Sequence, residues 1–423
     1  MKFNYGKIFL LGFGFFGVSV IWVVYNTYVP LFLANKFALS PAWIGFFMTL
    51  DNIAALFIQP PVGAWSDRLR TPLGRRMPFI LVGAPLGALA FGLIPLAAVL
   101  PLFVACTSTL LLSMAFWRTP VIALMPDITP SQFRSQANGI INLMGGLGTI
   151  VASLVGSSLY EINPNFPFWM GSGLVVLAAL MVFFFIKEPR EYEQSPAETQ
   201  PGMFASLREL LRAEEKSGIL LLSAIFFLFL AYNGIDTFLS LYATRRLGLP
   251  EGDAGRLVGH LGLFFVLFAL AGGWVGARLG RKVTISAGAL ALTALIAALF
   301  FLPVDFLAHT FAKLPVLGAI RGVSLLLMPA GIAWAMVNVN TLPMVVDLTV
   351  SARLGTFTGL YYLFSTLAAI LGPNLNGWLI QLSGNNYNVI MLIPPFFLLI
   401  AVGLMQGVRR GEAQKGDKIA AKA

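Results

Sequence analysis

Long apolar runs separated by short polar stretches dominate the chain. A membrane-spanning helix needs about 20 predominantly apolar residues, and twelve runs in the 423-residue sequence reach this length. We predict spans at residues 8–33, 42–64, 78–100, 102–124, 137–160, 166–186, 217–243, 254–276, 283–302, 314–345, 355–382 and 389–408. The pattern therefore predicts an all-α membrane protein with twelve transmembrane helices. Two long runs contain Pro30 and Pro329, and we expect these helices to tilt or bend.

A single long polar segment, residues 187–216, divides the runs into two sets of six. Its prolines break regular structure, whereas residues 203–215 are predicted to form an amphipathic helix on the membrane surface. The expected domains are a six-helix bundle at 1–187, a cytoplasmic linker at 188–216, a second six-helix bundle at 217–408 and a basic cytoplasmic tail at 409–423.

The two sets of six repeat each other. Tyr25-Asn26 in the first run matches Tyr232-Asn233 in the seventh, and the polar loop 63–76 resembles residues 273–282. An Asp followed by an Arg closes the fourth and the tenth run alike. The three matches keep similar spacing along the whole chain, so we predict two pseudo-symmetric six-helix bundles. In transporters built from such repeats, the binding site lies near the membrane midplane between them.

Composition and charge agree with a membrane protein and exclude several other classes. The chain is 58% hydrophobic and only 11% charged, too little charge to cover a soluble protein of this length. Of the 28 Lys and Arg residues, 21 lie in the termini and in loops on the same side of the membrane, which predicts that both termini are cytoplasmic. The net charge of +10 thus reflects topology, and no nucleic-acid partner is expected. A single cysteine, Cys106, rules out a disulfide framework.

Motifs in the first half carry a family resemblance. The loop Gly63 to Arg76, with its Asp-Arg pair and its Gly-Arg-Arg, resembles the signature loop of the major facilitator superfamily. The stretch from Gln59 to Ile80, and the segment around Asp127, resemble the sucrose-transporter branch of the glycoside–pentoside–hexuronide cation symporters. The resemblance implies the major facilitator fold and proton-coupled uptake of a sugar: a disaccharide, an oligosaccharide or a glycoside.

The sequence departs from that branch in three places. Melibiose-type relatives carry paired acids for sodium in the second span, where this chain offers Asp51 and then Gln59, so we expect H⁺ rather than Na⁺ as coupling ion. Plant sucrose carriers have an Arg where this chain has Ile122, and Arg118 lies one helical turn earlier. The second signature loop has Ala277 in place of its acid.

Two acids fall well inside predicted spans, Asp51 and Asp236. A carboxylate there is costly, so such residues usually mark ion or proton pathways. We predict that both couple proton movement to transport; the alternative is that one is a structural ion-pair partner. Gln59 lies two turns after Asp51 on the same helix face.

Candidate substrate-binding residues combine aromatic rings, amides and one cation. Tyr25, Asn26, Tyr232 and Asn233 form a pseudo-symmetric set suited to a sugar ring and its hydroxyls, and the alternative for them is hydrogen bonding between helices. Gln59 and Arg118 complete the predicted site. Arg118 could instead extend toward the membrane interface. Arg321 is placed inside the tenth span, and His260 in the eighth could join a proton path or simply be hydrogen-bonded.

A further charged set lies at predicted cytoplasmic helix ends. The family resemblance implies a gate there, made of modest and breakable charge contacts; the alternative is that the Arg residues serve topology alone. The predicted gate residues are Asp67, Arg68, Arg75, Arg76, Asp127, Arg134, Asp347 and Arg353.

The sequence therefore predicts a secondary transporter of a sugar, working by alternating access in a cell inner membrane as a monomer. No enzyme motif, ATP-binding loop or metal-ligand cluster occurs, so neither catalysis nor a cofactor is expected beyond the coupled H⁺. A proton-driven exporter of amphipathic compounds would share the fold and the acids. A membrane sensor would need a larger soluble domain than the linker offers.

Overall fold

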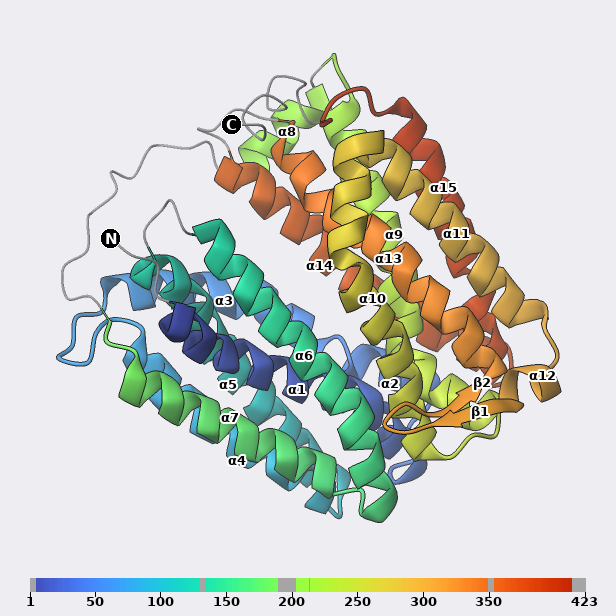
Figure 1. Cartoon of the computed structure of the whole chain (residues 1–423), viewed down its shortest axis with the longest axis horizontal. Coiled ribbons are helices and arrows are strands. Elements are labelled where there is room, and N and C mark those ends of the chain that lie inside the picture. Colours follow the sequence, from blue (N-terminus) through green and yellow to red (C-terminus); the bar gives the residue numbers. More distant parts are fainter. Residues whose placement is uncertain (1–4, 130–133, 189–202, 213, 349–353, 413–423) are drawn as a thin grey trace. The chain divides into compact units, whose positions relative to one another are not determined.

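The computed structural model describes residues 5–129, 134–188, 203–212, 214–348 and 354–412 (Figure 1). Within them, twelve helices are long and apolar enough to cross a membrane, which confirms the predicted number of spans. The helices and strands are α1 (Tyr5–Asn35), α2 (Pro41–Phe47), α3 (Leu50–Arg68), α4 (Met77–Leu93), α5 (Leu100–Ile128), α6 (Arg134–Ile162), α7 (Phe166–Phe185), α8 (Met203–Arg212), α9 (Ser217–Leu241), α10 (Glu251–Leu279), α11 (Arg281–Phe301), α12 (Val304–Ala308), β1 (Thr310–Leu314), β2 (Gly318–Arg321), α13 (Gly322–Val346), α14 (Leu354–Leu382) and α15 (Pro394–Gly407).

Three short helical segments extend these spans. A 3₁₀ turn, Ile94–Leu96, follows α4, and another, Tyr387–Met391, precedes α15. A π-helical turn, Tyr242–Arg246, continues α9. Helices α2 and α3 together form the second span, Pro41–Arg68.

The chain packs as two compact units. The first contains residues 1–195, 239–259 and 313–319, and the second contains 196–238, 260–312 and 320–423. The units therefore depart from a simple division at the linker, because the end of α9 and the start of α10 belong with the first six spans.

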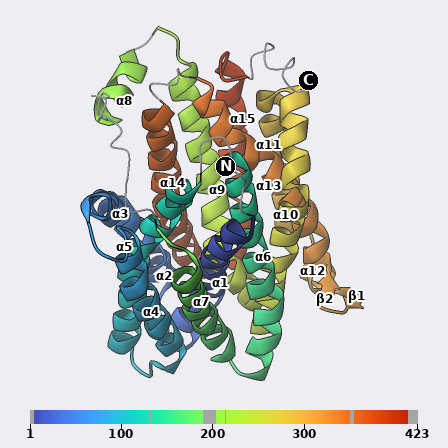
Figure 2. The same ribbon diagram turned by 60° about the vertical axis from the view of Figure 1, so that its left-hand side comes forward.

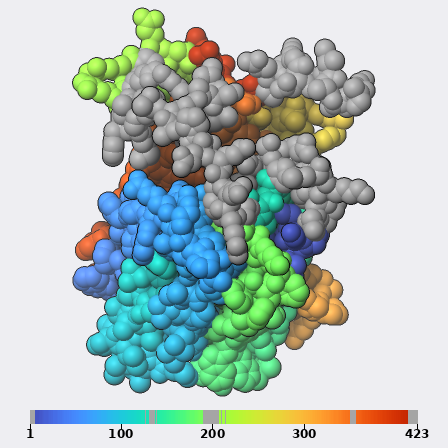
Figure 3. All heavy atoms as spheres, turned by 90° about the vertical axis from the view of Figure 1, so that its left-hand side faces the viewer, coloured from blue at the N-terminus to red at the C-terminus, as the bar shows by residue number. Residues whose placement is uncertain are grey.

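In the first unit, α1 packs against α6 and α7, and α4 packs against α5 and α7. Glycines allow this close approach: a Cβ at Gly83 would lie 2.7 Å from Trp117 Cβ, and one at Gly12 would lie 2.7 Å from Met144 Cγ. On the face drawn in Figure 3, the atoms of the first unit, coloured from blue to green, form a continuous surface.

In the second unit, α11 packs against α13 and α15. Helices α9 and α14 meet where Gly234 faces Gly372, since a Cβ at Gly372 would lie 2.7 Å from the carbonyl oxygen of Leu230. Asn340 of α13 donates a hydrogen bond of 3.0 Å to the carbonyl oxygen of Gly272 in α10. Small residues and one polar side chain thus hold these helices together.

The predicted start of the tenth span is wrong. Residues 310–321 form a two-stranded hairpin, β1 and β2, and the helix begins only at Gly322. The apolar run misled the prediction because hairpin and helix are equally apolar here. Arg321 accordingly lies at the N-cap of α13 rather than inside a span, and its Nη1 donates to the carbonyl oxygen of Ala308 at 2.9 Å.

Helix α8 occupies part of the polar segment between the two sets of six spans. After it, Glu215 accepts a 3.0 Å hydrogen bond from the backbone N–H of Ser217, the first residue of α9. This hydrogen bond lowers the pKa of Glu215. The cap therefore forms with the ionised carboxylate, and it is lost as the pH falls through that lowered pKa.

Candidate functional site

A break in the second span positions Asp51. Helix α2 ends at Phe47, and α3 begins at Leu50 after a two-residue turn. Thr49 is fully buried in this turn, and its hydroxyl donates to the carbonyl oxygen of Phe46 at 2.7 Å. Asp51 consequently lies in the first turn of α3, where the helix dipole favours a negative charge.

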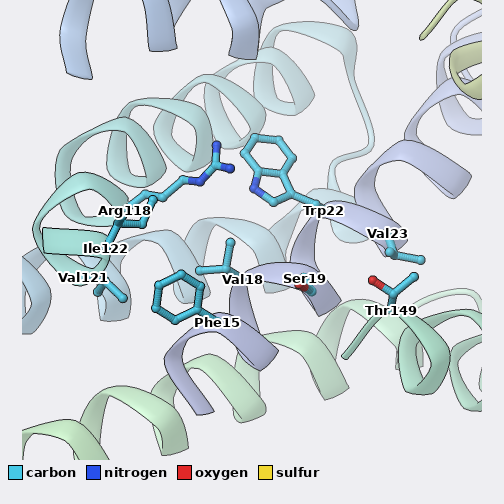
Figure 4. A pocket seen from close by; sticks show the side chains of 9 residues that line it. All are labelled: Phe15, Val18, Ser19, Trp22, Val23, Arg118, Val121, Ile122 and Thr149. Carbon is cyan, nitrogen blue, oxygen red and sulfur yellow. The ribbon is translucent and has the colours of Figure 1, made fainter. Parts of the chain in front are cut away.

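A cavity of about 210 Å³ lies among α1, α5 and α6 of the first unit (Figure 4). Arg118 is its charged lining residue, and hydroxyl groups come from Ser19 and Thr149. The remaining lining is apolar: Phe15, Val18, Trp22, Val23, Val121 and Ile122. Ligand pockets usually measure about 300–1,000 Å³, so this cavity is smaller than most ligand pockets.

Arg118 and Trp22 meet at one end of this cavity. Figure 4 shows the two side chains pointing toward each other. The guanidinium carbon of Arg118 lies 6.0 Å from the centre of the Trp22 ring, within the range of a cation–π contact. The charge of Arg118 also acts on Asp51, and the charge of Asp51 acts on Tyr25. The structure thus places two predicted residues, Arg118 and Tyr25, beside Trp22, which the sequence analysis missed.

Two donors beside this corner are buried without partners. Trp22 Nε1 and the Tyr25 hydroxyl make no hydrogen bond to any residue that the structure describes. Tyr25 is only 1% exposed, and its ring meets that of Trp22 edge-on at 6.0 Å. Buried polar groups normally have partners, and these two are among several buried polar atoms of the described residues that have none.

The second unit has an aromatic group in the matching place. Tyr232 of α9 stacks flat on Trp334 of α13, with ring centres 4.2 Å apart and an angle of 5° between the planes. Phe229 contacts the same Trp334 edge-on at 5.4 Å. Asp236 lies one turn after Tyr232, and its charge acts on the Tyr232 hydroxyl. Trp22 and Tyr25 in α1 have the same spacing as Phe229 and Tyr232, a signal that could have revealed Trp22.

The predicted amides do not join these groups in the same way. Asn233 Nδ2 donates 2.7 Å to the carbonyl oxygen of Phe229 in its own helix, so its amide N–H is engaged locally. Asn26 and Gln59 are half-buried, and neither lines the cavity. His260 is fully buried with its Nδ1 3.0 Å from the Ser324 hydroxyl.

Charged residues cluster where α4 begins. Arg75 Nη2 lies 2.6 Å from Asp127 Oδ1, and Arg76 Nε lies 3.0 Å from Asp127 Oδ2. Arg76 also pairs with Asp67, and it is only 4% exposed. Four of the predicted gate residues therefore form one network. Arg68 is exposed at the end of α3.

Glu188 completes this network and was missed by the sequence analysis. Its carboxylate accepts hydrogen bonds from the backbone N–H groups of Arg75 and Arg76 at 3.0 Å and of Met77 at 3.2 Å. These are unpaired donors at the start of α4, which a carboxylate caps well. Gly74 enters this turn with a φ of 110°, and a Cβ there would collide with Glu188.

The second unit repeats the arrangement. Arg281 pairs with Asp347, and Glu412 accepts 2.7 Å and 2.8 Å hydrogen bonds from the backbone N–H groups of Arg281 and Lys282 at the start of α11. Gly280 has a φ of 101°, like Gly74. The side chain of Arg134, and the whole of Arg353, fall outside the described residues.

A different charged cluster joins α6 to α10 at the opposite ends of the first unit's helices. Arg256 binds Glu161 through two hydrogen bonds of 2.5 Å and 2.8 Å, and it also pairs with Asp253 at 2.7 Å. Glu251 accepts a 2.6 Å hydrogen bond from Asn35 Nδ2. We name Glu161, Glu251, Asp253 and Arg256 the α6–α10 cluster; no sequence motif marked it.

Glycines bring α10 against α6 beside this cluster. A Cβ at Gly255 would collide with Ser157 and lie 2.7 Å from the Tyr28 hydroxyl, and one at Gly259 would lie 2.8 Å from Leu154 Cδ2. Tyr28 stacks on Tyr160 with ring centres 4.1 Å apart. The contact is therefore tight, and its charged groups surround a closely packed surface.

Twelve spans, two repeated sets of six and matching helix-end clusters define a transporter assembled from parallel repeats. A model described as Major Facilitator Superfamily matches residues 11–373. The chain belongs to this superfamily, and it is accordingly a membrane transporter rather than an enzyme.

Known proteins resemble the chain at low identity. Multidrug resistance protein 2 of Bacillus subtilis is 25% identical over 58% of this chain and 59% of its own. The general alpha-glucoside permease of Schizosaccharomyces pombe is 26% identical over 55% of this chain and 46% of its own. The chain thus spans about half the length of these curated relatives. A bacterial homologue of the human lysosomal transporter Spinster has the same fold, with a TM-score of 0.74 and 15% identity over 94% of this chain and 95% of that one.

Proposed function

We propose that the chain is a secondary active transporter that takes up a sugar together with a proton. The observation that carries this proposal is the contact between Arg118 and Trp22, where the buried Trp22 Nε1, without a protein partner, adjoins a cavity. The sucrose-type motifs and the alpha-glucoside permease among its relatives support the same substrate class.

The chemistry of this corner suits a sugar. A pyranose ring offers apolar faces that pack on aromatic rings and hydroxyl oxygens that accept hydrogen bonds. Trp22 and Phe15 supply rings, while Arg118, Ser19 and Thr149 supply polar groups. An acceptor on the sugar would satisfy Trp22 Nε1 and so recover the free energy lost by burying that donor alone.

Asp51 and Asp236 are the proposed proton carriers. Protonation of Asp51 would remove the attraction between its carboxylate and the Arg118 guanidinium. The guanidinium could then bind the substrate. Movement of one proton down about 100 mV supplies roughly 2.3 kcal/mol, or about a fiftyfold gradient. The helix-end networks around Asp127 and Asp347 would act as the gate on the face carrying the termini, which we propose is cytoplasmic.

The deciding experiment follows external pH in weakly buffered cells that express the protein, on addition of a panel of disaccharides and glycosides. Symport predicts external alkalinisation that starts with one sugar and disappears with a protonophore. The Asp51→Asn and Asp236→Asn variants should bind the sugar but fail to concentrate it. Accumulation by both variants against a gradient would remove these residues from the coupling role.

The second candidate function is proton-driven export of amphipathic compounds. The multidrug resistance relative favours it, as does the largely apolar lining of the cavity. An exporter should lower the cellular content of lipophilic cations and ignore sugars. If no sugar moves protons while such a cation is expelled, the export function replaces the sugar function.

A further inference from the structure

The hairpin between α12 and α13 exposes an apolar tip. Val316 in its turn is 72% exposed, Phe311 is 51% exposed and Leu314 is 46% exposed. Figure 2 shows α12, β1 and β2 together beside the ends of α11 and α13. This connection joins two spans on the face opposite the termini, and the exposed side chains lie where the chain leaves one span and enters the next.

The base of the hairpin is fixed. Ile320 and Leu307 are buried at 6% and 1% exposure. The N–H of Gly322 donates to the carbonyl oxygen of His309 at 3.1 Å, next to the bond from Arg321 to Ala308. Because the base is fixed, the hairpin holds its tip in the exposed position.

One side of the tip rests on the α6–α10 cluster. Gly318 has a φ of 72°, and a Cβ there would lie 2.6 Å from Cδ of Arg256 and 2.7 Å from its Nε. The backbone of the turn therefore packs on the stem of the arginine that binds Glu161 and Asp253. The apolar side chains Phe311, Leu314 and Val316 are left on the remaining surface.

Exposed side chains on α11 and α13, the helices before and after the hairpin, indicate what covers the hairpin tip. Phe301, at the end of α11, is 78% exposed, and Leu325, in the first turn of α13, is 44% exposed. Both belong to helices that span the membrane, so their exposed side chains face lipid. The hairpin connects the ends of these two spans, so its apolar tip lies at the same membrane face. Lys313 is the single charged residue between 310 and 320.

We propose that the hairpin tip inserts into the interfacial layer of the bilayer leaflet opposite the termini. Phe311, Leu314 and Val316 enter the boundary between headgroups and acyl chains, and Lys313 extends its amine to lipid phosphate. Since the turn packs on Arg256, the same insertion holds the hairpin against this residue of the α6–α10 cluster. The proposal does not depend on which substrate is carried.

The test is a depth measurement with nitroxide labels in vesicles of phosphatidylethanolamine and phosphatidylglycerol. Cys106 is the single cysteine, so a Cys106→Ala background allows one label at a time. Val316→Cys reports the tip. Leu270→Cys, 88% exposed on α10, gives the value for lipid, and Ser383→Cys, exposed after α14 on the same membrane face, gives the value for water.

Insertion predicts that the label at position 316 collides readily with dissolved oxygen and poorly with a water-soluble nickel complex, as at position 270. Access to nickel equal to that at position 383 would overturn the proposal. So would protection from both reagents, which would mean that protein or a second copy covers the tip.

A second measurement uses the same two variants without the nitroxide. The thiol of Val316→Cys should react more slowly with a charged maleimide than the thiol of Ser383→Cys, because the charged reagent enters the headgroup layer poorly. Adding Leu314→Asp to the first variant should restore fast reaction. Equal rates for the two single variants would also overturn the proposal.

Discussion

At the scale of single residues, the two acids inside the spans lie in different surroundings. Asp51 accepts a 2.9 Å hydrogen bond from Asn52. The positive charge of Arg118 also interacts electrostatically with its carboxylate. Asp236 lies beside the stacked pair of Tyr232 and Trp334. If Asp51 carries the proton, as proposed above, a substrate that engages Arg118 would change the attraction of this cation for the Asp51 carboxylate.

Arg118 and Trp22 should contribute unequally to substrate binding. Arg118→Ala removes a charged donor, and we expect affinity to fall by about tenfold to a hundredfold, since such bonds contribute roughly 1.5–3 kcal/mol. Trp22→Phe keeps an aromatic face and loses only the N–H, so its loss should be several-fold. Calorimetric titration of the purified variants measures both. A larger loss for Trp22→Phe than for Arg118→Ala would contradict this ranking.

At the scale of elements, hydrophobic patterning predicted the spans because lipid imposes a length and a polarity on each helix. It could not distinguish the hairpin at 310–321 from the start of α13, since both are apolar. Repetition of Tyr25 and Tyr232 identified matching positions, but the caps by Glu188 and Glu412 join residues more than one hundred positions apart. Such pairs depend on how the helices fold together, which the spacing of residues along one chain does not record.

The caps should stabilise their helices measurably. Glu188→Gln weakens three hydrogen bonds to backbone donors at the start of α4, and we expect a loss of roughly 1–2 kcal/mol, typical of a helix cap. Thermal unfolding of the purified protein in detergent should show a lowered midpoint. Glu412→Gln should act alike on α11, whereas substitution of the exposed Glu214 is the control and should leave the midpoint unchanged.

The contact between α6 and α10 should not tolerate bulk. Gly255→Leu overpacks the surface against Ser157 and Tyr28, at a cost of about 1–3 kcal/mol, and should force the helices apart. With Leu154→Cys as reporter in the Cys106→Ala background, we expect faster reaction with a membrane-impermeant maleimide and slower transport.

Gly173→Leu is the matched control for this contact, because a Cβ at Gly173 meets nothing within 4 Å. It should alter neither the reaction rate nor transport. Unchanged labelling in Gly255→Leu would show that the α6–α10 contact does not limit access from this face.

At the scale of the whole molecule, the division into units does not follow the repeat. Residues 239–259 come from the second set of spans yet pack with the first unit, through Arg256, Glu251 and the glycines of α10. In the α6–α10 cluster, Glu161 is partly exposed, whereas Asp253 and Arg256 are largely buried.

The distribution of Lys and Arg predicts a definite orientation. A fluorescent protein fused to the C-terminus should fluoresce in bacterial cells, because it folds in the cytoplasm. Alkaline phosphatase fused there should be inactive, because it is active only outside the cytoplasm. Phosphatase inserted after Ser383 should be active. Active phosphatase at the C-terminus would show that the orientation is the reverse of the predicted one and that the helix-end networks lie outside.

The caps by Glu188 and Glu412 also set an order of assembly during synthesis. The start of α4 emerges from the ribosome long before its cap, which comes only after α7, the last helix of the first six. Until Glu188 arrives, the donors at Arg75, Arg76 and Met77 must rely on water or lipid headgroups. The carboxylate thus closes the first bundle at the moment its final helix is made, and Glu412 repeats the step some 220 residues later. A nascent chain that stops before residue 188 would lack this cap at the start of α4.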